Sequence, residues 1–123
     1  MESVLYYEPM PLMNTAAVTD VCQRFGLAVI PVTRAQAGEC VGYLAGYQGF
    51  APRPGAGQET PPEDRVLLFC EVERGKLDAV LEGLKAAGAP RALKAILTGT
   101  NASWSFARLA RELSSEHRAM GGS

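Results

Sequence analysis

The fold is decided by the stretch Val66-Leu67-Leu68-Phe69-Cys70-Glu71-Val72, which is almost continuously apolar. A strand of this composition is covered on at least one face and has a neighbour on each side, so we expect it at the centre of a sheet. An apolar stripe at helical spacing follows it, ended by Gly88 and Pro90, and Leu93 to Leu97 then form the next strand. The stripe consists of Leu77, Val80, Leu81 and Leu84.

The first part of the chain has the same order of elements. Ser3 to Glu8 read as a central strand, and Asn14 is placed to cap a helix that stops at Gly26. The apolar stripe of this helix is Val18, Val21, Cys22 and Phe25. Leu27 to Val32 are a second strand, which we expect at a sheet edge because Pro31 cannot donate a ladder hydrogen bond.

The two halves echo each other at an offset of 62 positions, since Val4 corresponds to Val66 and Gly26 to Gly88. This repeat predicts an α+β fold, a ferredoxin-like split βαβ sandwich (βαββαβ) with the two apolar strands central. An extra C-terminal helix runs from a cap at Ser103 to about Ala119. The alternative is a doubly wound parallel sheet, which requires a crossover in the connection between the halves.

We expect one domain over residues 1–123, with the two halves joined by a long connection. Thr33 to Gln36 have the form of a capping box, and Cys40 to Ala45 can make about two helical turns. Residues 51–65 are rich in proline and glycine, so a flexible, exposed loop is expected there. Residues 121–123 are expected to be a frayed tail.

Composition excludes several classes of protein. The chain has 123 residues, of which 47% are hydrophobic and 20% charged, as in a globular domain. Its net charge of −1 gives no attraction for phosphate backbones, so we expect no nucleic-acid partner. No apolar run approaches the roughly 20 residues of a membrane span, and Met1-Glu2-Ser3 is unlike a signal peptide, so a cytoplasmic protein with no membrane partner is expected.

The candidate site is the junction that follows the last strand. A strand that turns into a helix leaves backbone N–H groups free at the helix N-terminus, where the dipole favours an anion. Polar side chains are grouped there, and the chain's one tryptophan ends the junction. The predicted ligand-binding residues are Thr98, Thr100, Asn101, Ser103 and Trp104.

Trp104 falls away from the apolar stripe of the last helix, so something else must cover it. We expect it to pack on the connection from Tyr43 to Phe50, with a subunit interface and a ligand wall as the alternatives.

Two segments carry a family resemblance: Val41-Gly42-Tyr43-Leu44-Ala45-Gly46 and Leu97-Thr98-Gly99-Thr100-Asn101-Ala102-Ser103-Trp104. From Val4 to His117 the chain resembles a family of small bacterial proteins, catalogued as domain of unknown function 3783. The resemblance implies no activity. In that family a proline usually stands where this chain has Gly99.

Catalytic and metal-binding patterns are weak in this sequence. His117, the one histidine, is interpreted as structural, and Glu59, Glu63 and Asp64 as a solvated face. Cys22, Cys40 and Cys70 are widely spaced, so we expect reduced thiols, no metal and no cofactor.

Three functional hypotheses remain. The first is a non-enzymatic, small-ligand-responsive or protein-interaction domain that self-associates into a homo-oligomer and binds a small anionic ligand or a protein partner. The second is an enzyme with an anion site from Thr98 to Trp104. The third is a thiol redox protein that uses Cys40.

Overall fold

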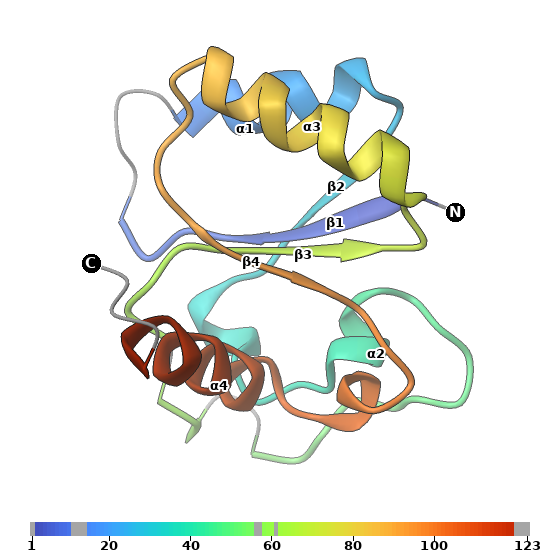
Figure 1. Ribbon diagram of the computed structural model, residues 1–123. Coiled ribbons are helices and arrows are strands. Elements are labelled where there is room, and N and C mark those ends of the chain that lie inside the picture. The colour runs from blue at the N-terminus through green and yellow to red at the C-terminus, as the bar shows by residue number, and fades with distance from the viewer. Residues whose placement is uncertain (1, 11–14, 56–57, 61, 120–123) are drawn as a thin grey trace.

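The computed structural model describes residues 2–10, 15–55, 58–60 and 62–119. These described residues form four strands and four helices, together with short 3-10 helices (Figure 1). In chain order the elements are β1 (Ser3–Tyr7), α1 (Thr15–Arg24), β2 (Ala28–Pro31), η1 (Arg34–Gln36), α2 (Val41–Leu44), β3 (Val66–Cys70), α3 (Arg74–Ala86), β4 (Leu93–Ile96), η3 (Asn101–Ser103) and α4 (Phe106–Ala119).

The four strands form one mixed sheet in the order β2-β1-β3-β4. The central pair β1 and β3 is antiparallel, with Leu5 opposite Leu68, and each edge strand runs parallel to its central neighbour. The two apolar strands are therefore central, as predicted, and the strand that contains Pro31 is at an edge.

The ferredoxin-like order is not what the sheet shows. A split βαβ unit would place β3 between β1 and β2, whereas β2 lies beside β1. The apolar pattern distinguishes central from edge strands, but it does not say at which edge each outer strand lies. The doubly wound parallel alternative is also wrong, because β1 and β3 are antiparallel.

Helices cover both faces of the sheet (Figure 1). Alternation along the strands sends Val4 and Phe69 into the core under α1 and α3, and Leu5 and Leu68 into the core under α2 and α4. In the second core the ring of Tyr7 lies 5.6 Å from that of Phe106. The extra helix thus covers the sheet face that a two-layer sandwich leaves open.

The predicted helix ends and turns are largely confirmed. Gly26 and Gly88 follow α1 and α3 with φ of 79° and 68°, the left-handed conformation that glycine adopts freely. The capping box at Thr33 forms with Gln36. The proposed cap of α1, Asn14, lies outside the described residues.

The last helix begins later than predicted. It starts at Phe106, and Ser105 is its cap, because the Arg108 N–H donates to Ser105 Oγ at 3.1 Å. Ser103 instead ends η3, and Trp104 is extended, with ψ of 152°. The prediction failed because both serines suit a helix start, and a bridge to the preceding connection selects Ser105.

The connection over residues 51–65 has no helix or strand in its described part. Among the bonds that hold it to the domain, Tyr7 Oη donates to Pro62 O (2.8 Å), Ser105 Oγ to Glu59 Oε1 (2.9 Å) and Arg53 Nη2 to Ser103 O (3.0 Å). Its flexibility stays a prediction.

Of the helices in the described part of the chain, none is both long enough and apolar enough to cross a membrane.

Candidate functional site

The candidate site is the open edge of the sheet at β4, which is one of the two outer strands. β4 pairs with β3 alone, and Leu93 N donates to Arg65 O at 2.8 Å and Leu97 N to Phe69 O at 2.9 Å. Because successive residues of a strand direct their backbone groups to opposite sides, Lys94 and Ile96 direct theirs away from the sheet. The side chain of Ile96 is 53% exposed, which is unusual for a large aliphatic residue.

Two of the outward carbonyl groups along this edge have partners. Asn101 Nδ2 donates to Ile96 O at 3.1 Å, and Lys94 Nζ donates to Ala92 O at the same distance. Within the described ranges, the N–H and C=O of Lys94 and the N–H of Ile96 have no partner. An edge of this kind is ready to pair with one more extended segment.

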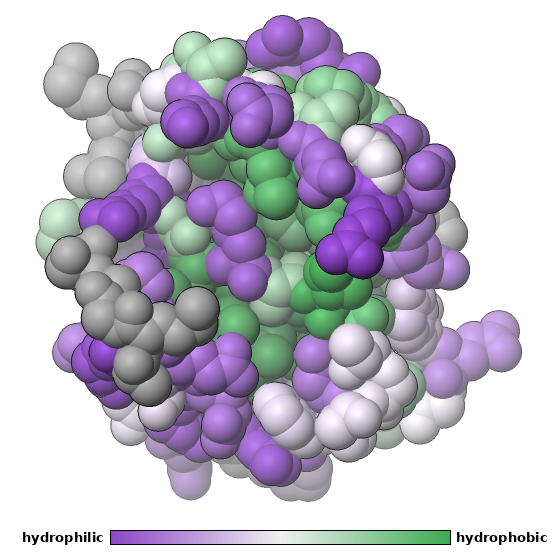
Figure 2. Space-filling view, in the orientation of Figure 1, coloured by the Kyte–Doolittle hydropathy of each residue, from purple (hydrophilic) through white to green (hydrophobic). Residues whose placement is uncertain are grey.

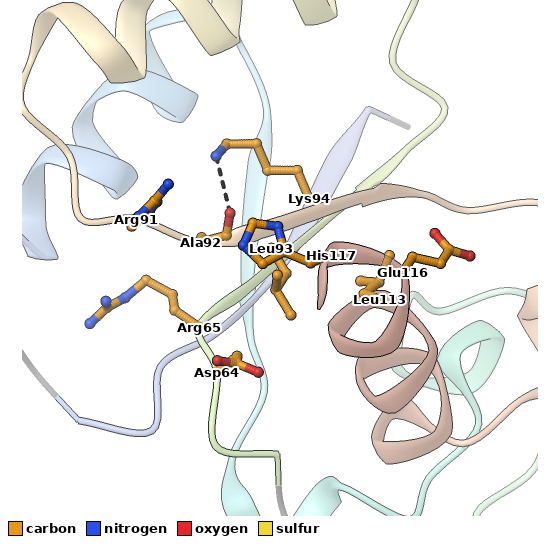
Figure 3. A pocket seen from close by; sticks show the side chains of 9 residues that line it. All are labelled: Asp64, Arg65, Arg91, Ala92, Leu93, Lys94, Leu113, Glu116 and His117. Carbon is orange, nitrogen blue, oxygen red and sulfur yellow. Dashed lines mark hydrogen bonds between the residues drawn. The ribbon is translucent and has the colours of Figure 1, made fainter. Parts of the chain in front are cut away.

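A cavity of about 440 Å³ lies beside β4 on the side of α4 (Figure 3). Its walls combine the start of β4, the last turns of α4 and the residues before β3. They are formed by Asp64, Arg65, Arg91, Ala92, Leu93, Lys94, Leu113, Glu116 and His117. Figure 3 shows Arg65 and Arg91 at one end of this group of side chains and Glu116 at the other.

Arg65 is the fixed cation of this cavity and is only 8% exposed. Its Nε donates to Tyr6 Oη at 3.1 Å, its Nη2 donates to Met10 O at 2.8 Å, and the carboxylate of Glu8 lies 4.0 Å away. These bonds use two of the five N–H groups of the guanidinium. Burial, together with the bond that Tyr6 donates to Glu8, raises the pKa of Tyr6 to about 12.

Arg91 and Lys94 make the edge electropositive. The Lys94 side chain is exposed, yet desolvation by the protein around its ammonium lowers its pKa, and the charge of Arg91 lowers it further. An anion bound between these side chains would relieve that repulsion. The ammonium of Lys94 and the guanidinium of Arg91 together suit the binding of a carboxylate.

Two further cavities continue this region. One of about 420 Å³ lies on the α3 side of β4 and shares Arg91 and Lys94, with Lys85 added. The other, of about 580 Å³, shares Arg65 and Arg91 and adds Arg34. Figure 2 shows apolar side chains gathered in the middle of the face that β4 crosses, with polar side chains around them.

The residues predicted as a ligand site lie beyond the other end of β4. Thr98 and Asn101 bond to each other, since Thr98 N donates to Asn101 Oδ1 at 2.9 Å and Asn101 N to Thr98 Oγ1 at 3.1 Å. Thr100 and Ser103 are exposed, and Trp104 is half-buried. None of the five lines the three cavities above or a fourth one beside α4.

Trp104 packs against the core that includes Val41 and Phe106, and the guanidinium of Arg108 lies 4.2 Å from its ring centre. Packing of its ring on the connection from Tyr43 to Phe50 stays a prediction. The cation over the ring covers part of its outer face.

The first turn of α4 has its N–H groups occupied by this chain. Phe106 N donates to Glu39 O at 3.0 Å, and Ala107 N to Ala37 O at 2.8 Å. Arg108 and Leu109 donate to Ser105. The premise of the predicted anion site, free N–H groups at a helix start, is thus not met at α4, while binding by the five side chains stays a prediction.

The other candidate residues are placed as follows. Cys22 and Cys70 are buried, and burial raises the pKa of both thiols, that of Cys22 to about 11. Cys40 is half-buried, and its Sγ donates to Ser103 O at 3.6 Å. His117, interpreted from the sequence as structural, is exposed at the cavity wall.

Among the acids of the connection, Glu59 accepts from Ser105 and Asp64 from Ser114 Oγ at 2.5 Å. Over the described ranges, no group of three His, Cys, Asp or Glu side chains is arranged to hold a metal ion.

Sequence reasoning missed Arg65, Arg91, Lys94 and Ile96. The available signal was Lys94, a charged residue in the middle of an otherwise apolar strand, which is a common mark of an exposed sheet edge. No sequence pattern indicates that Arg65 and Arg91 line the same cavity, because only the pairing of strands in the sheet brings them together.

The fold and this edge define a class of protein, an α+β domain whose four-stranded mixed sheet is covered on both faces and open at β4. Residues 65–120 match the family described as "Domain of unknown function (DUF3783)", which confirms the resemblance over the second half of the chain. No curated protein and no solved structure gives a significant match.

Proposed function

We propose that this chain is a non-enzymatic protein-interaction domain, and that the open edge of β4 binds an extended, acidic segment of a partner protein. The observation that carries the proposal is the outward direction of the Lys94 N–H and C=O and the Ile96 N–H, which have no partner in the described part of the chain. A segment added as a fifth strand would pair with them.

The side chains around β4 supply the preference for an acidic segment. Arg91 and Lys94 stand at the edge itself, with Lys85 in one flanking cavity and Arg65 in the other. Alternate side chains of an added strand point to opposite faces of a sheet, so they would enter the two cavities in turn. Glutamate or aspartate at those positions would meet a cation in either cavity.

A second copy of this chain is a poorer occupant of the same edge, although self-association was expected. Antiparallel pairing centred on two β4 strands would bring Lys94 of each copy to neighbouring positions. Like charges at such positions are destabilising, and lysine on an edge strand commonly prevents pairing of this kind. The proposal therefore commits to a different partner.

The proposal places the domain in the cytoplasm, where its three thiols would stay reduced. It assigns no reaction to the domain.

The test is the binding of a labelled peptide, Glu-Val-Glu-Val-Glu, measured by fluorescence anisotropy with Lys-Val-Lys-Val-Lys as control. The acidic peptide should bind, and Lys94→Glu should weaken binding at least about tenfold, or about 1.4 kcal/mol. Arg24→Glu makes the same change of charge on α1 and should alter the affinity less than about twofold. Equal binding of both peptides, or equal effects of the two variants, would contradict the proposal.

A further inference from the structure

The cations near β4 are concentrated at one end of the strand. Arg91 lies two positions before the first residue of β4, and Arg65 directly precedes β3, so both flank the N-terminal end of β4. They line the same two cavities, and Figure 3 shows both at the end of the first cavity away from Glu116. At the other end of β4, the carbonyl of Ile96 is already occupied by Asn101.

This asymmetry sets a direction for an added segment. A segment parallel to β4 would bring its N-terminal side toward Arg65 and Arg91, and a free amino group there would be repelled. An antiparallel segment would bring its C-terminal side to the same place. Antiparallel pairing also lets one residue of the segment bond to both the N–H and the C=O of Lys94.

We infer that the segment bound at β4 is the free C-terminus of a partner protein, running antiparallel to β4 with its terminal carboxylate at Arg65 and Arg91. The inference rests on the proposed function and names the chemistry of its ligand. From Lys94 to Arg91 is three residues, or about 10 Å of strand at roughly 3.3 Å per residue. The residue opposite Lys94 is thus the third or fourth from the end of the partner.

The two arginines have different roles at this position. Arg65 is buried and held by Tyr6 and the carbonyl of Met10, so its charge is fixed in place. Arg91 is exposed and free to close on a bound carboxylate with two parallel N–H bonds. The chain's own carboxylates in this region are Glu8, 4.0 Å from Arg65, and those of Glu63, Asp64 and Glu116 in the cavity walls, of which Asp64 accepts a bond from Ser114.

The test compares two peptides that differ in one group, Val-Glu-Val-Glu-Val with a free terminal carboxylate and the same peptide as its terminal amide. Titration calorimetry with the full chain should show the free acid binding at least about tenfold more tightly. Arg91→Gln should reduce that ratio to about twofold or less. Lys85→Gln, which removes a cation from the other flanking cavity, should leave the ratio unchanged.

Orientation is tested separately with a paramagnetic label at the N-terminus of the free-acid peptide. Signals near Leu97 should broaden more than signals near Arg91. Equal affinity of acid and amide, a ratio that persists in Arg91→Gln, or broadening at Arg91 would overturn the inference while the proposed function stands. Absence of binding by both peptides would overturn the proposed function itself.

Discussion

Cys40 and Ser105 are paired in an isolated antiparallel bridge that joins the two halves of the chain. On one side of the pair Val41 N donates to Trp104 O at 2.9 Å, and on the other Phe106 N donates to Glu39 O at 3.0 Å. The bridge holds α2 and the start of α4 together under the same face of the sheet. It explains why the first turn of α4 is closed to ligands.

The bridge predicts which serine caps α4. Ser105→Ala should lower the free energy of unfolding by about 1 to 2 kcal/mol, because Arg108 N loses its acceptor and Glu59 loses the hydroxyl that bonds to it. Ser103→Ala, at the exposed position first expected to cap the helix, should change it by less than about 0.5 kcal/mol. Urea denaturation measures both, and a larger loss in Ser103→Ala would contradict the assignment.

Asn101 is predicted to be a structural residue. Its side chain accepts from Thr98 N and donates to Ile96 O, so Asn101→Ala should cost about 1 to 3 kcal/mol because two partly buried backbone groups lose their partners. Thr100→Ala, at the exposed neighbour, should be nearly neutral. Equal midpoints of thermal unfolding for Asn101→Ala and Thr100→Ala would contradict a structural role for Asn101.

Gly42 permits close packing of Phe50 on α2. A Cβ at position 42 would lie 2.6 Å from Cε2 of the Phe50 ring, so Gly42→Ala should destabilise the domain by about 1 to 3 kcal/mol. In a Phe50→Ala background the same change should become neutral or stabilising, because alanine favours the helix once the ring is gone. Gly99→Ala meets nothing within 4 Å and is the control. A cost that is equal in both backgrounds would rule out the ring as its cause.

Tyr6 gives the domain an alkaline limit. Its pKa of about 12 in the folded state lies above the ordinary value of 10.0, so the folded state holds the proton more tightly. The resulting contribution of Tyr6 to the free energy of unfolding is fully present below pH 10 and is lost as the pH rises through 12. This contribution is at most about 2 to 3 kcal/mol. Burial shifts the pKa of Tyr7, Tyr47 and Cys22 in the same direction.

Comparison with Tyr6→Phe isolates the contribution of Tyr6. Urea denaturation at pH 8 and pH 11 should show a smaller loss of stability for this variant than for the wild-type protein, because the other groups titrate in both. An identical loss in the two proteins would show that the hydroxyl of Tyr6 is not responsible.

The repeat could be found from the sequence, but its register could not. Val4 was matched to Val66, yet Val4 faces α1 and α3 while Val66 faces the opposite core. A shift of one residue moves every side chain of a strand to the other face, so the equivalent of Val4 is Leu67. Gly26 and Gly88 were matched correctly, since both end helices with positive φ.

The repeat extends further than the identities suggested. Thr33 with Gln36 and Thr98 with Asn101 close the same kind of turn after each edge strand. Cys40 and Ser105 then occupy equivalent positions and pair with each other. Different side chains make equivalent bonds in the two halves, so a comparison of residue identities alone does not reveal this part of the repeat.

The candidate site was the least predictable part. The polar junction from Thr98 to Trp104 resembled a site, but its central groups satisfy one another. The edge of β4 is open because no strand of the described chain lies on its outer side. Which strand is outermost depends on the order of strands in the sheet. Sequence periodicity carries no information on that order when both outer strands are short.

The most direct test of the account is amide hydrogen exchange at β4, measured by NMR with and without the free-acid peptide Val-Glu-Val-Glu-Val. Strand addition should slow exchange of the Lys94 and Ile96 amides at least about tenfold. The Ala95 amide, which alternation directs toward β3, should change little. Binding that leaves Lys94 and Ile96 unprotected, or that protects amides from Thr98 to Trp104 instead, would contradict the central claim that the open edge of β4 is the binding surface.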